Sequence, residues 1–139
     1  MKYYLINIFT RNDLLFEEQA ITEEKKKPDF IFPNGECYHN MLFPSEDLVV
    51  LGAKTTCKDR WRQVLTEADR VDEKYLFTLQ QGISKNQLKE MYDARLTLVV
   101  PHKYIPCFPP EYQDKLSDLA KFIQMVSEKQ KHLPKSYTV

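Results

Sequence analysis

Short apolar runs recur along the chain at intervals that suit buried strands. The most apolar is residues 48–53, Leu-Val-Val-Leu-Gly-Ala, whose β-branched residues predict a strand covered on both faces. Comparable runs predict further strands at residues 14–21, 29–32, 74–79 and 96–100. In the first of these, consecutive glutamates interrupt the alternation of apolar and polar positions.

Helical spacing follows the central apolar run directly. Trp61, Val64, Leu65 and Ala68 fall at the i, i+3, i+4 and i+7 positions of one helix face. The threonines at residues 55–56 are available to cap this helix.

Three other segments complete the expected elements. Ser84 and Gln87 form a capping-box pattern that predicts a helix over Ser84–Ala94, and a long helix is expected over Glu111–Lys131. Residues 3–9 fit either a strand or the tail of a helix. The order of elements predicts an α/β fold with a mixed central β-sheet flanked by helices.

Three polar residues stand at positions where chemistry could be placed. Asp29 begins a predicted strand, Lys54 ends the central strand, and Glu67 lies on a flank of the helix that follows. Carboxylates are hard oxygen ligands for Mg²⁺, and a lysine places a cation near a scissile phosphate. The set therefore fits phosphodiester hydrolysis. Taken singly, each residue also has an ordinary explanation: a strand-start acid, a lysine that reaches solvent, and a surface glutamate.

Two longer strings resemble a known family. They are residues 25–33, Lys-Lys-Lys-Pro-Asp-Phe-Ile-Phe-Pro, and residues 52–64, Gly-Ala-Lys-Thr-Thr-Cys-Lys-Asp-Arg-Trp-Arg-Gln-Val. Both closely resemble the catalytic domain of EcoRII-type restriction endonucleases, which belong to the PD-(D/E)xK nuclease superfamily. The resemblance implies a restriction-endonuclease-like core, with residues 3–9 as the tail of a helix. It also implies a Mg²⁺-dependent type II endonuclease that cuts double-stranded DNA as a homodimer and leaves 5′-phosphates.

The same resemblance implies catalytic roles for Asp29, Lys54, Glu67 and Tyr38. Most enzymes of the superfamily carry an acid two residues before the lysine, where this chain has Gly52. The EcoRII-type subgroup places that acid at the position of Glu67. We therefore expect Asp29 and Glu67 to bind Mg²⁺, Lys54 to orient the attacking water, and Tyr38 to supply a supporting hydrogen bond.

Sequence readout is expected from Lys58, Asp59 and Arg60, at the start of the predicted helix. Arg and Lys pair with guanine O6 and N7, and Asp accepts from cytosine N4, so this trio suits CC/GG steps. The resemblance implies the same, because family members read CC and GG around a central base or base pair, as in CCWGG-like sites. The alternative is a solvated helix terminus whose arginine is bonded to local acids.

Amino-acid composition narrows the class of protein to which the chain can belong. The chain has 139 residues, with 20 basic and 20 acidic side chains, so no overall positive field attracts nucleic acid non-specifically. Its three cysteines form no Cys-x-x-Cys pair, which favours reduced thiols in a cytoplasmic protein. No apolar run is long enough to span a membrane.

The length predicts one endonuclease catalytic domain over residues 1–139, with residues 132–139 frayed. Relative to the family, the N-terminal sequence is short. Related enzymes carry further N-terminal sequence, including a helix with an additional active-site acid. The alternative function is therefore a truncated, catalytically inactive remnant that binds DNA.

Overall fold

The computed structural model describes residues 1–23, 25–57 and 60–133. The expectation that residues 132–139 are frayed therefore falls mostly outside the described chain. The helices and strands are, in chain order, α1 (Lys2–Arg11), β1 (Glu17–Glu18), β2 (Phe30–Phe32), α2 (Gly35–His39), β3 (Val49–Lys54), α3 (Trp61–Leu65), β4 (Lys74–Thr78), α4 (Lys85–Asp93), β5 (Leu96–Val99), α5 (Pro110–Gln113) and α6 (Leu119–Lys131). Two short 3-10 helices, Ser45–Asp47 and His102–Cys107, precede β3 and α5.

The strands form a single mixed sheet in the order β1-β2-β3-β4-β5. The pairs β1–β2 and β2–β3 are antiparallel, whereas β3, β4 and β5 run parallel. The register places Ala53 beside Phe77 and Lys54 beside Thr78, so β3 and β4 end together. This arrangement confirms the predicted α/β class with a mixed sheet flanked by helices.

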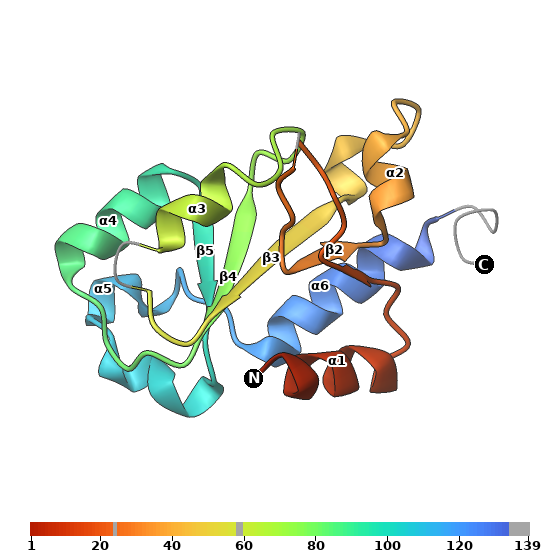
Figure 1. The fold of residues 1–139 in the computed structure, drawn as a ribbon. Coiled ribbons are helices and arrows are strands. Elements are labelled where there is room, and N and C mark those ends of the chain that lie inside the picture. Colours follow the sequence, from red (N-terminus) through yellow and green to blue (C-terminus); the bar gives the residue numbers. More distant parts are fainter. Residues whose placement is uncertain (24, 58–59, 134–139) are drawn as a thin grey trace.

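One face of the sheet is covered by α1 and α6, which lie beside each other in Figure 1. Aromatic rings dominate this layer: Phe9 of α1 meets Phe30 edge-on with a centroid distance of 5.4 Å, and Phe122 of α6 meets Phe32 at 5.6 Å. Leu5, a helical residue with no exposed surface, also packs in this layer. The helix reading of residues 3–9, which the resemblance favoured, is confirmed.

The other face is covered by α3 and α4 over β4 and β5, and by α2 over β2 and β3 (Figure 1). Side chains alternate along a strand, so residues two apart share a face. Ile31 and Val50 pack on this face. Asp29 therefore lies on the same side as Ile31, and Lys54 on the same side as Val50. The sheet thus brings two of the expected site residues to one face.

The helix after β3 is shorter than predicted. It begins at Trp61 rather than near residues 55–56, so neither threonine caps it, and it ends at Leu65. Just beyond its end, the Thr66 hydroxyl donates to the Gln63 carbonyl oxygen at 2.9 Å, a bond that competes with helix continuation. Glu67 consequently follows the helix instead of lying on its flank.

The long C-terminal helix predicted over Glu111–Lys131 is also wrong. It is divided into α5 and α6, because the intervening backbone runs beside β5. There Ser117 N donates to Leu98 O, and Val100 N donates to Ser117 O, both at 2.9 Å. Asp118 then caps α6 by accepting from Lys121 N at 2.8 Å.

Smaller differences occur near the first strands. Only Glu17–Glu18 of the expected strand 14–21 pairs with β2. Before α2, Asn34 is the N-cap and accepts from Cys37 N at 2.8 Å. The predicted capping of α4 by Ser84 is confirmed, since its hydroxyl accepts from Gln87 N at 3.3 Å.

Gly52 allows α3 to approach β3 closely. A Cβ built there would lie 2.6 Å from Val64 Cγ2, closer than real Cβ contacts allow, and 3.3 Å from Leu76 Cδ1, which is a tight contact. Glycine at residue 52 therefore has a packing role on the face that carries Lys54. An acid at this position would be blocked by the core.

The first prediction follows from this contact. Gly52→Ala is expected to lower the free energy of unfolding by about 1–3 kcal/mol, because the added methyl group overpacks the core. Urea denaturation of Gly52→Ala, Val64→Ala and the double variant would measure it. If Val64 is the obstacle, the double variant loses less than the sum of the single variants; additive losses would show that it is not.

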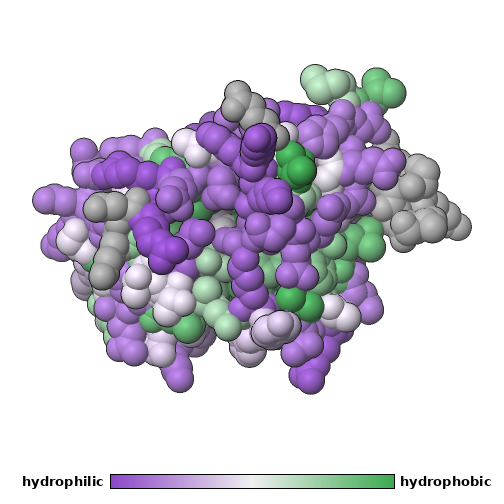
Figure 2. Space-filling view, viewed as in Figure 1, coloured by the Kyte–Doolittle hydropathy of each residue, from purple (hydrophilic) through white to green (hydrophobic). Residues whose placement is uncertain are grey.

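The exterior is mostly polar. Figure 2 shows a largely hydrophilic face on which hydrophobic atoms occupy small separate areas. Among the helices of the described chain, none has the length and apolar character needed to cross a membrane.

Candidate active site

Asp29 is buried, and both of its carboxylate oxygens are in use. Oδ2 accepts from Ala53 N at 2.8 Å and lies 3.7 Å from Lys54 Nζ. Oδ1 lies 2.8 Å from Lys2 Nζ and accepts from Gln19 Nε2 at 3.2 Å. The backbone bond to Ala53 fixes the carboxylate beside the end of β3, because Ala53 is itself held in the sheet.

These partners determine the charge of Asp29. Burial acts to raise the pKa of the carboxyl, but the hydrogen bonds from Lys2 and Ala53 N and the charge of Lys54 outweigh it. The pKa of Asp29 is therefore lowered, and the carboxylate is ionised at neutral pH.

Glu67 is held at the site by its backbone. Its carbonyl oxygen accepts a short hydrogen bond from the Thr22 hydroxyl. Its side-chain Oε1 is buried and has no hydrogen-bond partner among the described residues. Burial, and then the neighbouring charge of Asp29, raise the pKa of Glu67 to about 7, although Lys54, Lys26 and Lys2 oppose the shift. Two carboxylates at one site thus have pKa values pushed in opposite directions, a feature that is frequent where metal or proton chemistry occurs.

The donor set fits a hard divalent cation. Such an ion between Asp29 and Glu67 would offset their mutual repulsion and give the buried Glu67 Oε1 a ligand. No group of three or more His, Cys, Asp or Glu side chains suited to a metal occurs in the part of the chain that the structure describes. Mg²⁺ suits the pair best, because it commonly uses one or two carboxylates and keeps several waters.

Tyr38 is bonded to Glu23 and to the backbone of Arg70. Its buried hydroxyl forms a short hydrogen bond to Glu23 Oε1 and accepts from Arg70 N at 3.2 Å. The hydroxyl therefore supports the loop that follows Glu67. Burial, and then the hydrogen bond to Glu23, raise the pKa of Tyr38 to about 12, so the hydroxyl stays protonated.

Of the residues expected to read DNA, only Arg60 is described, and Lys58 and Asp59 lie outside the described residues. Arg60 is exposed, and its backbone N–H donates to Cys57 O at 2.8 Å. The neighbouring Arg62 is engaged elsewhere, since it pairs with Glu90 at 2.5 Å. Arg60 is thus exposed in the segment between β3 and α3.

Sequence reasoning missed several residues around Asp29. Lys2 comes from α1 and Gln19 from the segment after β1, and neither belongs to a motif. Lys26, whose charge acts on Glu67, falls in the lysine run of residues 25–27. No local pattern identifies Lys2 or Gln19, because only the folded chain brings them to Asp29.

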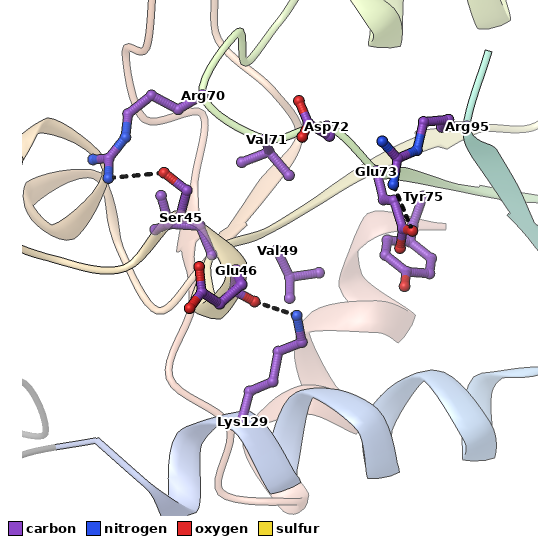
Figure 3. Close-up of a pocket in the computed structure, with 11 residues that line it drawn as sticks. Ser45, Glu46, Val49, Arg70, Val71, Asp72, Glu73, Tyr75, Arg95 and Lys129 are labelled. Atoms are coloured by element: carbon purple, nitrogen blue, oxygen red, sulfur yellow. Dashed lines mark hydrogen bonds and ion pairs between the residues drawn. The ribbon is translucent and has the colours of Figure 1, made fainter.

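A cavity of about 320 Å³ lies elsewhere, beside Val49 and Tyr75 at the opposite ends of β3 and β4 (Figure 3). None of Asp29, Lys54 and Glu67 lines it. Its cations are paired with groups of its own wall: Arg70 with Ser45, Lys129 with Glu46, and Arg95 with Glu73. These pairs stabilise the loops around the cavity. The candidate active site is therefore assigned to the side of the sheet that carries Asp29.

Comparison with known proteins gives consistent results. Residues 1–123 match the family described as EcoRII C terminal. The type II restriction enzyme EcoRII of Escherichia coli is 45% identical over 124 residues, which are 88% of this chain and 31% of that enzyme. The chain therefore spans about a third of that relative's length.

Solved structures show the same fold. Metal-depleted Ecl18kI in complex with uncleaved, modified DNA has a TM-score of 0.79, and its complex with uncleaved DNA has 0.78. Both are 20% identical to this chain and cover 98% of it, while it covers 47% and 48% of theirs.

Proposed function

Because this chain belongs to the EcoRII C-terminal family, we propose that it is the catalytic domain of a type II restriction endonuclease. In this proposal it hydrolyses double-stranded DNA in the cytoplasm, as a Mg²⁺-dependent homodimer, at CC/GG-containing, CCWGG-like sites. The products carry 5′-phosphates. One observation carries the catalytic part: the ionised, buried Asp29 lies beside Lys54 and raises the pKa of Glu67.

The proposed work of the residues follows from their positions. Asp29 and Glu67, with the carbonyl of Ala53, would hold the metal. Bound Mg²⁺ supplies Lewis-acid stabilisation of charge on the phosphate and on the leaving 3′ oxygen. Lys54 keeps its ammonium 3.7 Å from Asp29 Oδ2, with 17% of its side chain exposed. There it can orient the attacking water and offset phosphate charge.

Two further roles are proposed. Tyr38 supports the site through the loop after Glu67, because its hydroxyl accepts from Arg70 N. Lys58, Asp59 and Arg60 read the CC/GG steps, with the basic side chains directed to guanine and the acid to cytosine. The exposure of Arg60 supports this role.

One observation favours the second candidate, an inactive remnant that binds DNA. Lys2 Nζ lies 2.8 Å from Asp29 Oδ1, so the cationic side chain of Lys2 occupies a carboxylate oxygen that a metal would use. If Lys2 is not displaced, the positive charge at the site can still attract the phosphates of DNA, but the DNA is not cleaved.

A plasmid assay separates the two candidates. Supercoiled DNA with CCWGG sites, and a matched plasmid without them, would be incubated with Mg²⁺ or with EDTA. The nuclease proposal expects discrete fragments with 5′-phosphate ends, only with Mg²⁺ and only from the first plasmid. Site-specific binding in EDTA without cleavage in Mg²⁺ would support the remnant. Absence of preferential binding to the sites would contradict both.

A further inference from the structure

The loops that follow β3 and β4 are bonded to each other through side chains. The Thr78 hydroxyl donates to Thr55 O at 3.1 Å and accepts from Gln80 N at 3.2 Å. Gln80 Oε1 in turn accepts from Cys57 N at 2.7 Å, and Gln80 Nε2 donates to Gly82 O at 3.4 Å. The loop that leaves Lys54 is therefore bonded to the neighbouring loop at two of its backbone groups.

The bond to Cys57 is the shortest in this network, and Cys57 has no exposed surface. A buried backbone N–H needs an acceptor, and here a glutamine side chain supplies it in place of a strand neighbour. On its other side, Cys57 O accepts from Arg60 N at 2.8 Å. Cys57 therefore links the two residues: its N–H bonds to the Gln80 side chain and its carbonyl oxygen bonds to the backbone N–H of Arg60.

We propose that Gln80 is a positioning residue for DNA sequence readout. By holding Cys57, it fixes the backbone from which Arg60 projects, so that the guanidinium meets a base edge in the correct direction. This inference rests on the proposed function. Gln80 itself need not touch DNA, since it acts through the Cys57 backbone.

The geometry also explains why loss of the Gln80–Cys57 bond should affect sequence readout more than overall affinity for DNA. Bidentate contacts to guanine need both direction and position, whereas attraction to phosphates tolerates displacement of a charge. Loss of the Gln80–Cys57 bond should therefore reduce discrimination between sequences and leave binding to random DNA nearly unchanged.

The test compares Gln80→Leu, which lacks the acceptor, with Gln80→Glu, which keeps an acceptor at the same reach. Gln81→Leu is the matched control, because Gln81 is an adjacent, exposed glutamine. Competition binding in EDTA at fixed salt gives the ratio of affinities for a CCWGG duplex and a random duplex, and thermal melting is recorded alongside. Gln80→Leu is expected to lower the ratio at least about fivefold, the low end of the effect of one lost base contact. Gln80→Glu and Gln81→Leu should keep the ratio within about twofold of the parent chain.

A double-variant cycle shows whether Gln80 acts through Arg60. If it does, Gln80→Leu combined with Arg60→Ala lowers the ratio no further than Arg60→Ala alone. An unchanged ratio in Gln80→Leu, or fully additive losses in the double variant, would overturn the inference. If Gln80→Leu does not melt cooperatively, Gln80→Ser, whose hydroxyl is too short to reach Cys57, takes its place under the same criteria. A parent chain that shows no preference for the CCWGG duplex would instead overturn the proposed function, and the inference with it.

Discussion

Lys54→Ala is expected to lower the rate of DNA cleavage by roughly 10²–10³-fold or more, the effect of removing one charge-stabilising group from an active site. Lys54 is the last residue of β3, and its ammonium faces Asp29 Oδ2 at 3.7 Å with part of the side chain exposed. Asp29 keeps its hydrogen bonds from Ala53 N and Gln19 and its ion pair with Lys2 in this variant, so the melting temperature should change little. Single-turnover cleavage of a CCWGG duplex at saturating Mg²⁺ measures the rate.

The control is Lys89→Ala, which removes a lysine from the exposed face of α4. Its cleavage rate should equal that of the parent chain. A Lys54→Ala cleavage rate within about tenfold of that of the parent chain would show that Lys54 has no role in the chemical step.

Asp29 needs a different substitution. The buried Ala53 N–H depends on Asp29 Oδ2, so alanine at residue 29 would leave that donor unsatisfied, at a cost of about 1–3 kcal/mol. Asparagine keeps an acceptor for Ala53 N and removes the charge. Asp29→Asn should therefore lose cleavage as Lys54→Ala does, while its fold is preserved.

Glu67→Gln is expected to stabilise the metal-free protein at high pH and to abolish its stabilisation by Mg²⁺. The folded-state pKa of Glu67 is about 7, against an ordinary value of 4.5, so folding favours the protonated form. Below pH 4.5 the Glu67 carboxyl is protonated in both the folded and the unfolded state, so it lowers the free energy of unfolding little. As the pH rises towards 7, the unfolded chain loses its proton first, and the folded state becomes relatively less stable. Above pH 7 this loss is complete.

The magnitude follows from the shift. A pKa raised from 4.5 to about 7 sets an upper limit of about 3 kcal/mol, and solvent screening of this partly exposed carboxylate lowers the contribution below that limit. Between pH 4.5 and pH 8 in EDTA, the stability of Glu67→Gln relative to the parent chain should therefore rise by up to about that amount. Urea unfolding of both proteins at each pH measures the difference, and comparison at equal pH removes the contribution of groups that titrate alike.

Addition of Mg²⁺ reverses the ranking. The parent chain should gain stability with metal concentration, because binding to the folded state adds free energy, whereas the glutamine variant should gain little. The Mg²⁺ concentration for half-maximal cleavage should rise in the variant for the same reason. A relative stability that does not change with pH would place Glu67 in ordinary surface surroundings.

Local sequence patterns predicted the elements whose limits are set locally. The strands near residues 30, 50, 76 and 98 and the capped helix after Ser84 depend on periodicity and on a nearby cap. The division of the C-terminal helix depends on a distant partner, because the backbone of Ser117 bonds to residues of β5 and just after it. The position of Glu67 after α3 likewise depends on Thr22, whose hydroxyl bonds to the Glu67 carbonyl oxygen. Of these features, the start of α6 is the one that the local sequence indicates, since Asp118 is a good N-cap before an apolar stripe.

The site was predictable to a similar degree. Positions at the ends of predicted strands and on a predicted helix, together with the family resemblance, indicated Asp29, Lys54 and Glu67. The structure places Asp29 3.7 Å from Lys54 and within range of the charge of Glu67. The additional cation at Asp29 was not predictable, because Lys2 reaches it from a helix on the other face of the sheet. Tyr38 was assigned by resemblance alone, and its hydroxyl is bonded to the loop beyond Glu67.

The close contact at Gly52 restricts the routes by which evolution could relocate the acid. A carboxylate at residue 52 requires space that Val64 fills, so residue 64 must become smaller before the acid can arrive. That first step removes core contacts and brings no benefit to catalysis. If Glu67 is the metal-binding acid, this chain could move the acid to residue 52 only through a less stable intermediate. Such a barrier would make the location of the acid a durable marker of descent, retained even where either location would serve the reaction equally well.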